Sequence, residues 1–235
     1  MNECRAIETR SRRFFLQGSA KLLIAAPLTI VYLPAAVAAE APPELAAILQ
    51  SAARAEMRAY QRYVRFARKA HAENYDGISY LFTALAASEL IHAQNYNRSI
   101  MKLGADIVLP GNPHMEIADT KKNLIVAAQA ELSSINNFYP KIVDQIETEA
   151  NGEAMRFVRY AWESHRQHKD IIDKIKKYAS DFFETVARRI DNSTDIFYVC
   201  EICGSTKNEL PPETCPICGY TVRHYEKLEP RAFLG

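Results

Sequence analysis

Four cysteines lie within nineteen residues near the C-terminus, arranged in two pairs. Cys200 and Cys203 form one Cys-x-x-Cys-Gly turn, and Cys215 and Cys218 form a second one. The glycine after each pair lets the backbone turn tightly around a sulfur, so that backbone amides can point at the thiolates. Two such turns supply a tetrahedral tetrathiolate, which suits zinc or a single iron equally well. Haem attachment is excluded, because Gly204 stands where a histidine would be needed.

A second set of possible metal ligands lies upstream, one or two in each of four long stretches. The set is Glu56, then Glu89 with His92, then Glu131, then His165 with His168. A spacing of three residues places both members of a pair on one face of a helix. Di-metal centres in helical bundles use one Glu from each of two helices and Glu-x-x-His from each of the other two. The sequence meets this pattern with one substitution, because His165 stands where Glu is expected. One such pair alone would be typical of a solvated helix surface, but the four together favour a metal centre.

Helices must position these side chains. From Pro43 to Ile190 the chain is rich in Ala, Leu, Glu, Arg and Lys, and apolar residues recur at spacings of three and four. Four helices are predicted, at residues 44–71, 77–103, 119–149 and 153–188. The segment 104–118 is long enough to cross over between two helix pairs, and Pro140 should kink the third helix. The predicted fold is mainly α, an antiparallel four-helix bundle followed by a small domain with a four-cysteine site.

Composition is that of an ordinary soluble globular protein, with 48% hydrophobic and 24% charged residues. The net charge of +1 gives no sign of a nucleic-acid partner or of a polybasic membrane patch. We therefore expect neither nucleic acid nor a membrane surface as a binding partner.

The N-terminus has the features of an export signal. The segment Ser11–Gln17 contains two adjacent arginines before Phe-Phe-Leu and precedes an apolar run at 22–39. It is similar to a twin-arginine signal, and Ala36-Val37-Ala38 offers a cleavage site, which predicts a signal peptide at 1–38 and a periplasmic protein. The protein would then meet a membrane only during export. An uncleaved membrane anchor is the alternative, although Pro27 and Pro34 interrupt its helix. The twin-arginine route carries folded proteins, which fits metals loaded before export and thiolates protected from oxidation.

The helical segments resemble those of rubrerythrins. The pattern Glu56-x-x-Ala59-x-x-x-Tyr63-x-x-Phe66-Ala67 is similar to the first-helix signature of that family, and the spacing to Glu89-x-x-His92 also matches. Phe138-Tyr139-Pro140 and Arg159-Tyr160-Ala161 are similar to family patterns in the third and fourth helices. The resemblance covers about residues 44–229. It implies a ferritin-like bundle at 39–190 and a rubredoxin-like domain at 195–235.

The resemblance also implies a function. In the family, a rubredoxin iron passes electrons to a di-iron centre, which reduces hydrogen peroxide to water. Iron is accordingly the expected metal at both sites, with zinc as the alternative for the cysteines. A homodimer is expected, with peroxide or dioxygen as substrate and an electron donor protein that the sequence does not identify. The alternatives are a non-catalytic electron carrier or metal-binding protein with a degenerate bundle site, and a ferroxidase or iron store.

Two departures from the family pattern fall at the chemical site. Rubrerythrins carry Glu-x-x-Glu on the third helix, whereas here Ser134 follows Glu131. They also carry a bridging Glu where this chain has His165. Three carboxylates and three histidines remain, a set that also suits zinc or copper. We expect one metal near Glu56, Glu89 and His92 and another near Glu131, His165 and His168, with Glu89 bridging. Nearby aromatic residues are expected to have packing roles: Tyr60, Tyr63, Tyr139 and Trp162.

Overall fold

The computed structural model describes residues 43–111, 114–147, 149, 151–191 and 196–234. The predicted signal peptide at 1–38 lies outside these residues. Most of the described chain is helical, and a small three-stranded sheet follows the helices. None of the described helices has an apolar stretch long enough to cross a bilayer.

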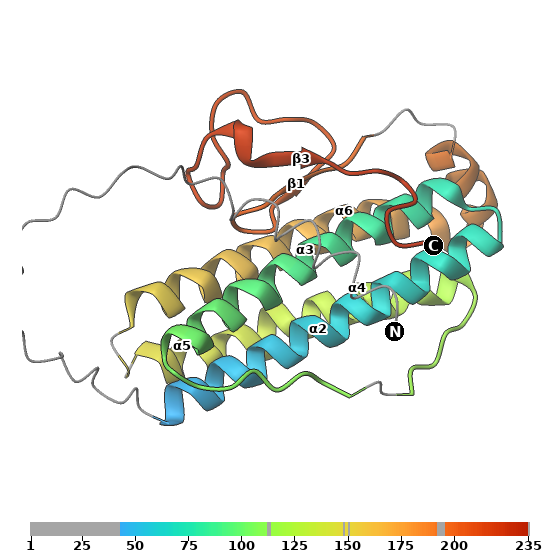
Figure 1. Ribbon diagram of the computed structural model, residues 1–235. Coiled ribbons are helices and arrows are strands. Elements are labelled where there is room, and N and C mark those ends of the chain that lie inside the picture. The colour runs from blue at the N-terminus through green and yellow to red at the C-terminus, as the bar shows by residue number, and fades with distance from the viewer. Residues whose placement is uncertain (1–42, 112–113, 148, 150, 192–195, 235) are drawn as a thin grey trace, which may run out of the picture. The chain divides into compact units, whose positions relative to one another are not determined.

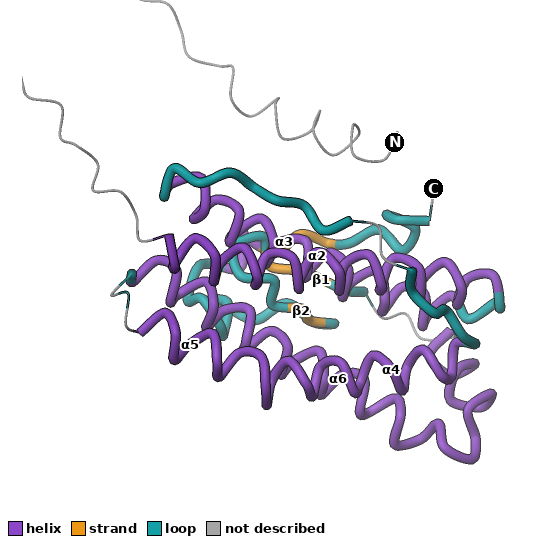
Figure 2. The backbone as a smooth tube through the Cα atoms, turned by 90° about the horizontal axis from the view of Figure 1, so that it is seen from below, coloured by secondary structure: helices purple, strands orange, loops and turns teal. Residues whose placement is uncertain are grey.

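Four helical rods run side by side, and the first and fourth run in the direction opposite to the second and third (Figures 1 and 2). The first two are α2, Pro43–Ala72, and α3, Asp76–Lys102. They pack along each other after a turn in which Asn74 adopts a positive φ of 62°. The chain then travels the length of the bundle before α4, Thr120–Ser133, begins. The predicted crossover at 104–118 is this connection.

The third rod is interrupted near Pro140. A π-helical turn, η1, covers Ser134–Phe138 between α4 and α5, and α5 spans Tyr139–Glu147. Proline has no N–H to donate to the carbonyl four residues earlier, and its ring crowds that carbonyl. The wider π turn accommodates this conflict, and such turns are common at functional sites. Sequence predicted a kink at the proline, whereas the irregular turn lies in the residues before it.

The fourth rod is α6, Gly152–Asp191, which packs against α3 and α4. Two apolar clusters fill the bundle, one toward each end. On every rod, residues of one cluster precede the predicted ligands and residues of the other follow them. On α2, for example, Leu49 and Ala52 belong to one cluster and Tyr63 and Phe66 to the other, with Glu56 between them. The bundle therefore holds one buried polar layer between two apolar ones.

The C-terminal domain is a small sheet that carries the cysteines. Its strands are β1 (Tyr198–Cys200), β2 (Thr206–Lys207) and β3 (Tyr225–Lys227), in the antiparallel order β2-β1-β3. A short 3-10 turn, η2 (Val222–His224), precedes β3. The sheet lies against α3 and α6 (Figure 1). The mainly helical, ferritin-like prediction with a small four-cysteine domain is confirmed.

Candidate metal centres

All six predicted bundle ligands meet in the buried polar layer. We call this set the bundle centre: Glu56 on α2, Glu89 and His92 on α3, Glu131 on α4, and His165 and His168 on α6. None of these side chains is more than slightly exposed. Their oxygen and nitrogen atoms form two groups, and within each group the donor atoms lie within 4.8 Å of one another. The spacing in the sequence thus indicated the individual residues, and the fold brings them together.

The two groups share two members. One contains Glu56, Glu89, His92 and His165, and the other contains Glu89, Glu131, His165 and His168. Glu89 lies between them as expected, with Oε2 3.0 Å from Nδ1 of His92 and Oε1 3.3 Å from Nδ1 of His168. The sequence predicted that His165 would belong to only one of the two groups. It was assigned to one metal, but its ring lies between both groups.

Each unshared carboxylate is held by a tyrosine. Tyr139 donates a hydrogen bond to Oε1 of Glu56, and Tyr63 donates one to Oε1 of Glu131. Burial, together with the nearby carboxylate charges, raises the pKa of both phenols well above the ordinary value, so both remain donors. These rings also pack in the core, as the sequence predicted. Their hydrogen bonds to the carboxylates were not predicted, because a tyrosine that only packs in the core and one that also donates a hydrogen bond look the same in the sequence.

The electrostatics of the bundle centre suit cations. Burial alone would raise the pKa of Glu56, but the charge of His165 and hydrogen bonds from neighbouring imidazoles hold it well below its ordinary value. The same balance, with His165 and His168, lowers the pKa of Glu131. For His168, burial alone would lower the pKa, but the nearby carboxylates of Glu131 and Glu89 raise it to about 9. The carboxylates thus concentrate negative charge in this layer, and without a metal the protonated histidines balance that charge.

Two buried atoms test whether these residues fit metal ions. Oε1 of Glu89 and Nδ1 of His168 have no hydrogen-bond partner among the described residues, although only 3.3 Å separates them. Unpaired buried polar atoms are costly, and both atoms point into the cluster as metal ligands would. Carboxylate oxygen and imidazole nitrogen are suitable ligands for iron, zinc or manganese. The residues present therefore fit a pair of metal ions.

The four cysteines also converge. They are free thiols, and three of them are fully buried. Sγ of Cys200 lies 3.8 Å from Sγ of Cys218, and Sγ of Cys203 lies 3.4 Å from Sγ of Cys215. Tetrahedral ligation with metal–sulfur bonds of about 2.3 Å requires sulfurs about 3.8 Å apart. The predicted tetrathiolate is therefore assembled with nearly the spacing that one metal ion needs.

The two sites are joined by direct hydrogen bonds. Nε2 of His92 lies 3.1 Å from the carbonyl oxygen of Cys203. The next carbonyl, that of Gly204, accepts hydrogen bonds from Ser88 at 2.6 Å and Ser164 at 2.9 Å. Gly204 has a φ of +77°, and a Cβ there would overlap His92 and lie 2.7 Å from the Ser88 hydroxyl. Nothing in the sequence indicated this contact, because a serine that binds another domain has no characteristic spacing within a helix.

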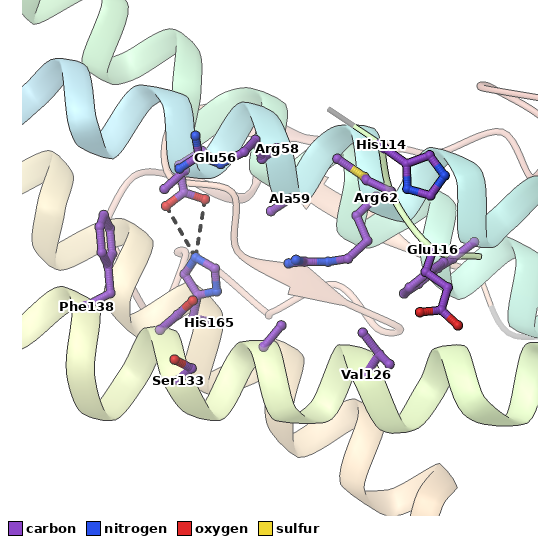
Figure 3. A pocket seen from close by; sticks show the side chains of 15 residues that line it. Glu56, Arg58, Ala59, Arg62, His114, Glu116, Val126, Ser133, Phe138 and His165 are labelled. Atoms are coloured by element: carbon purple, nitrogen blue, oxygen red, sulfur yellow. Dashed lines mark hydrogen bonds and ion pairs between the residues drawn. The ribbon is translucent and has the colours of Figure 1, made fainter. Parts of the chain in front are cut away.

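A cavity of about 600 Å³ leads to the bundle centre (Figure 3). Glu56 and His165 lie at one end of it, and His114 and Glu116 lie at the other. Ser134, which stands where the family pattern has Glu, is part of its wall. Arg62 extends into the space between α2 and α4, and its Nε has no hydrogen-bond partner among the described residues. The cavity is a route by which a small molecule can reach the metal ligands.

Comparison with known proteins identifies the family. The rubrerythrin family model matches residues 47–176, more than half of the chain. The chain belongs to the rubrerythrin family. It is 30% identical to rubrerythrin-2 of Clostridium acetobutylicum over 171 residues, which is 73% of this chain and 89% of that protein. It is 26% identical to nigerythrin of Nitratidesulfovibrio vulgaris, over 72% of this chain and 79% of that one.

Solved structures show the same fold. A structure of fully reduced, all-ferrous nigerythrin matches with a TM-score of 0.65 and 23% identity, over 89% of this chain and 100% of that chain. A bacterioferritin from Desulfovibrio desulfuricans matches with a TM-score of 0.59 and 16% identity, over 62% of this chain and 85% of that chain. This rubrerythrin is therefore a non-haem iron protein with a redox function.

Proposed function

We propose that this rubrerythrin reduces hydrogen peroxide to water at the bundle centre, with electrons relayed from iron at the four cysteines. The overall change takes hydrogen peroxide, two electrons and two protons to two molecules of water. Iron held by the bundle-centre carboxylates and histidines would supply the electrons that break the O–O bond. Iron held by the four cysteines would deliver one electron at a time, so each turnover would require two such deliveries.

One observation carries the proposal, the hydrogen bond between Nε2 of His92 and the carbonyl of Cys203. His92 presents its other nitrogen, Nδ1, to Glu89 at 3.0 Å. One imidazole thus spans from a bundle ligand group to the backbone of a cysteine ligand. A metal-ligating histidine normally anchors its outer nitrogen on a carbonyl or carboxylate, which fixes the ring. Here that anchor is part of the electron-donating site.

The remaining side chains have positioning roles. Tyr139 and Tyr63 donate hydrogen bonds to one oxygen of Glu56 and Glu131, and the other oxygen of each carboxylate lies near His165, where it could bind a metal. The two apolar clusters exclude water from the layer on both sides, which strengthens the electrostatic interactions inside it. Peroxide would enter through the cavity past Arg62, whose guanidinium can donate hydrogen bonds to its oxygens.

Rapid mixing tests the proposal. The protein with its native metals is reduced without oxygen and mixed with hydrogen peroxide, and the ferric-thiolate absorption is followed. We expect reoxidation of the four-cysteine iron that is fast, stoichiometric in peroxide and preceded by reoxidation of the bundle metals. Reoxidation at the background rate would favour the second candidate, an electron carrier with a silent bundle. That candidate is motivated by Ser134 and His165, which depart from the family pattern at the chemical site.

We also propose that the protein acts in the periplasm after twin-arginine export, and that it forms a homodimer. The arginine pair Arg12-Arg13 and the small residues before Glu40 support export. Substitution of both arginines by lysine should retain the protein in the cytoplasm, as fractionation would measure. Sedimentation analysis of the mature protein would test for the dimer.

A further inference from the structure

His165 differs from the other two histidines of the bundle centre in how its ring is held. Nδ1 of His92 and Nδ1 of His168 face the cluster, whereas their Nε2 atoms face outward. The outer partner of His92 is the carbonyl of Cys203, and His168 has the hydroxyls of Ser164 at 3.3 Å and Thr206 at 3.4 Å. These are the anchors that a ligating imidazole ordinarily has.

The ring of His165 has no such outer anchor among the described residues. Its Nδ1 lies 2.5 Å from Oε2 of Glu131, and its Nε2 lies 3.3 Å from Oε2 of Glu56. Both partners are predicted metal ligands, and they belong to different ligand groups. Nε2 also lies 3.5 Å from Oε2 of Glu89. Both nitrogens of one buried ring therefore face the cluster, from opposite sides of the ring.

We propose that His165 is a bridging ligand that bonds one metal through Nδ1 and the other through Nε2. One metal would be held by Glu131 and His168, the other by Glu56 and His92. Glu89 would be shared as well, because its two oxygens already face the two outer histidines. Each ion then has two oxygen and two nitrogen ligands, a set that suits a first-row divalent metal.

The charge of the buried layer supports this arrangement. Three carboxylates carry three negative charges, and two divalent ions carry four positive ones. A ring bonded at both nitrogens loses its remaining N–H proton, which is released to solvent when the metals bind. The resulting imidazolate contributes the fourth negative charge, so the loaded centre is neutral. Neutrality matters here because an uncompensated charge in a dry interior is expensive.

The arrangement fixes the distance between the metals. Two metals that share small bridging ligands lie about 3.5–4 Å apart. A ring bonded at both nitrogens separates its metals by about 6 Å, because two bonds of about 2.1 Å are added to the distance across the ring. This inference concerns only where two metals lie, so it does not depend on whether the protein reduces peroxide.

Anomalous diffraction at the iron edge tests it, with crystals of the full protein loaded with ferrous iron in the absence of oxygen. We expect two bundle peaks about 6 Å apart with the ring of His165 between them. Two peaks within about 4 Å, or a single peak in the bundle, would overturn the proposal. X-ray absorption on the same sample in solution should show no iron neighbour at about 3.5 Å.

A variant and a matched control sharpen the test. His165→Glu replaces the ring by a carboxylate and should shorten the metal separation to about 4 Å or less. His71→Gln removes an exposed histidine that pairs with Asp76, far along α2 from Glu56, and should leave the separation at about 6 Å. An unchanged separation in His165→Glu, in protein that still binds two irons, would also refute a bridge through the ring.

Discussion

The contact between the two metal sites can be tested by adding a single methyl group. Gly204→Ala places a Cβ where it overlaps Nε2 of His92 and lies 2.7 Å from the Ser88 hydroxyl. Gly219 is the equivalent glycine of the second knuckle, with a φ of +73° against +77°, and nothing lies within 4 Å of a Cβ there. Gly219→Ala is therefore a matched control for the backbone effect of alanine at positive φ.

The magnitudes of the two changes separate them. Alanine in the left-handed region costs about 1–2 kcal/mol at either position. Gly204→Ala must also move the knuckle by about 1 Å away from α3, which strains the hydrogen bonds of Ser88, Ser164 and His92. Three buried hydrogen bonds at about 1 kcal/mol each make Gly204→Ala less stable than the control by about 2–3 kcal/mol.

Electron delivery should follow the same order. Displacement of the knuckle lengthens the path between the two sites, and electron transfer slows as that path lengthens. We expect slower peroxide-driven reoxidation of the four-cysteine iron in Gly204→Ala, measured by rapid mixing, and a rate near wild type in Gly219→Ala. The four-cysteine absorption should be preserved in both variants. Equal rates in the two variants, with equal metal content, would refute the role of this contact.

Three further predictions follow from the bundle. In metal-free protein, the pKa of His168 is raised to about 9, so the stabilisation from its protonated ring is complete below about pH 6.5 and should be lost as the pH rises toward 9. The pKa of Glu131 is lowered, so the stabilisation from its carboxylate should be lost as the pH falls below about 4.5. Thermal unfolding against pH should thus show a maximum near pH 5–6.5, whereas the metal-loaded protein should show no decline toward pH 9. Tyr139→Phe leaves an oxygen of Glu56 without its donor, and should lower the free energy of unfolding of the metal-free protein by about 1.5–3 kcal/mol in denaturant titrations. Ala130→Leu narrows the cavity and should lower kcat/KM for peroxide while the iron content stays constant, and an unchanged kcat/KM would exclude this cavity as the entry route.

Sequence predicted the components of the site better than their arrangement. Glu-x-x-His spacing and the paired knuckles indicated all ten candidate ligands, because each depends on local geometry within a helix or a turn. The sharing of His165 between two groups depends on how α6 is rotated against α2 and α4, and no spacing within one helix encodes that rotation. Local sequence patterns likewise do not indicate which oxygen of Glu89 faces which histidine.

The irregular features of the fold show the same limit. Pro140 indicated a disturbance in the third helix, but the π turn at Ser134–Phe138 depends on how the chain accommodates the proline. Docking of the C-terminal domain depends on Ser88, Ser164 and Gly204, which are small residues with many ordinary roles. Only a tertiary structure shows that the two hydroxyls share one carbonyl.

The hydrogen bond from His92 to Cys203 has a kinetic consequence, since both of its ends belong to one chain. In the proposed relay, transfer of an electron between the two sites would be a unimolecular step, and its rate constant would not change with protein concentration. Dilution that separates the proposed dimers into single chains should leave this step intact. A donor protein would therefore limit turnover only through its own encounter with the four-cysteine site. The dependence of the turnover rate on donor concentration would then measure that encounter and no other step.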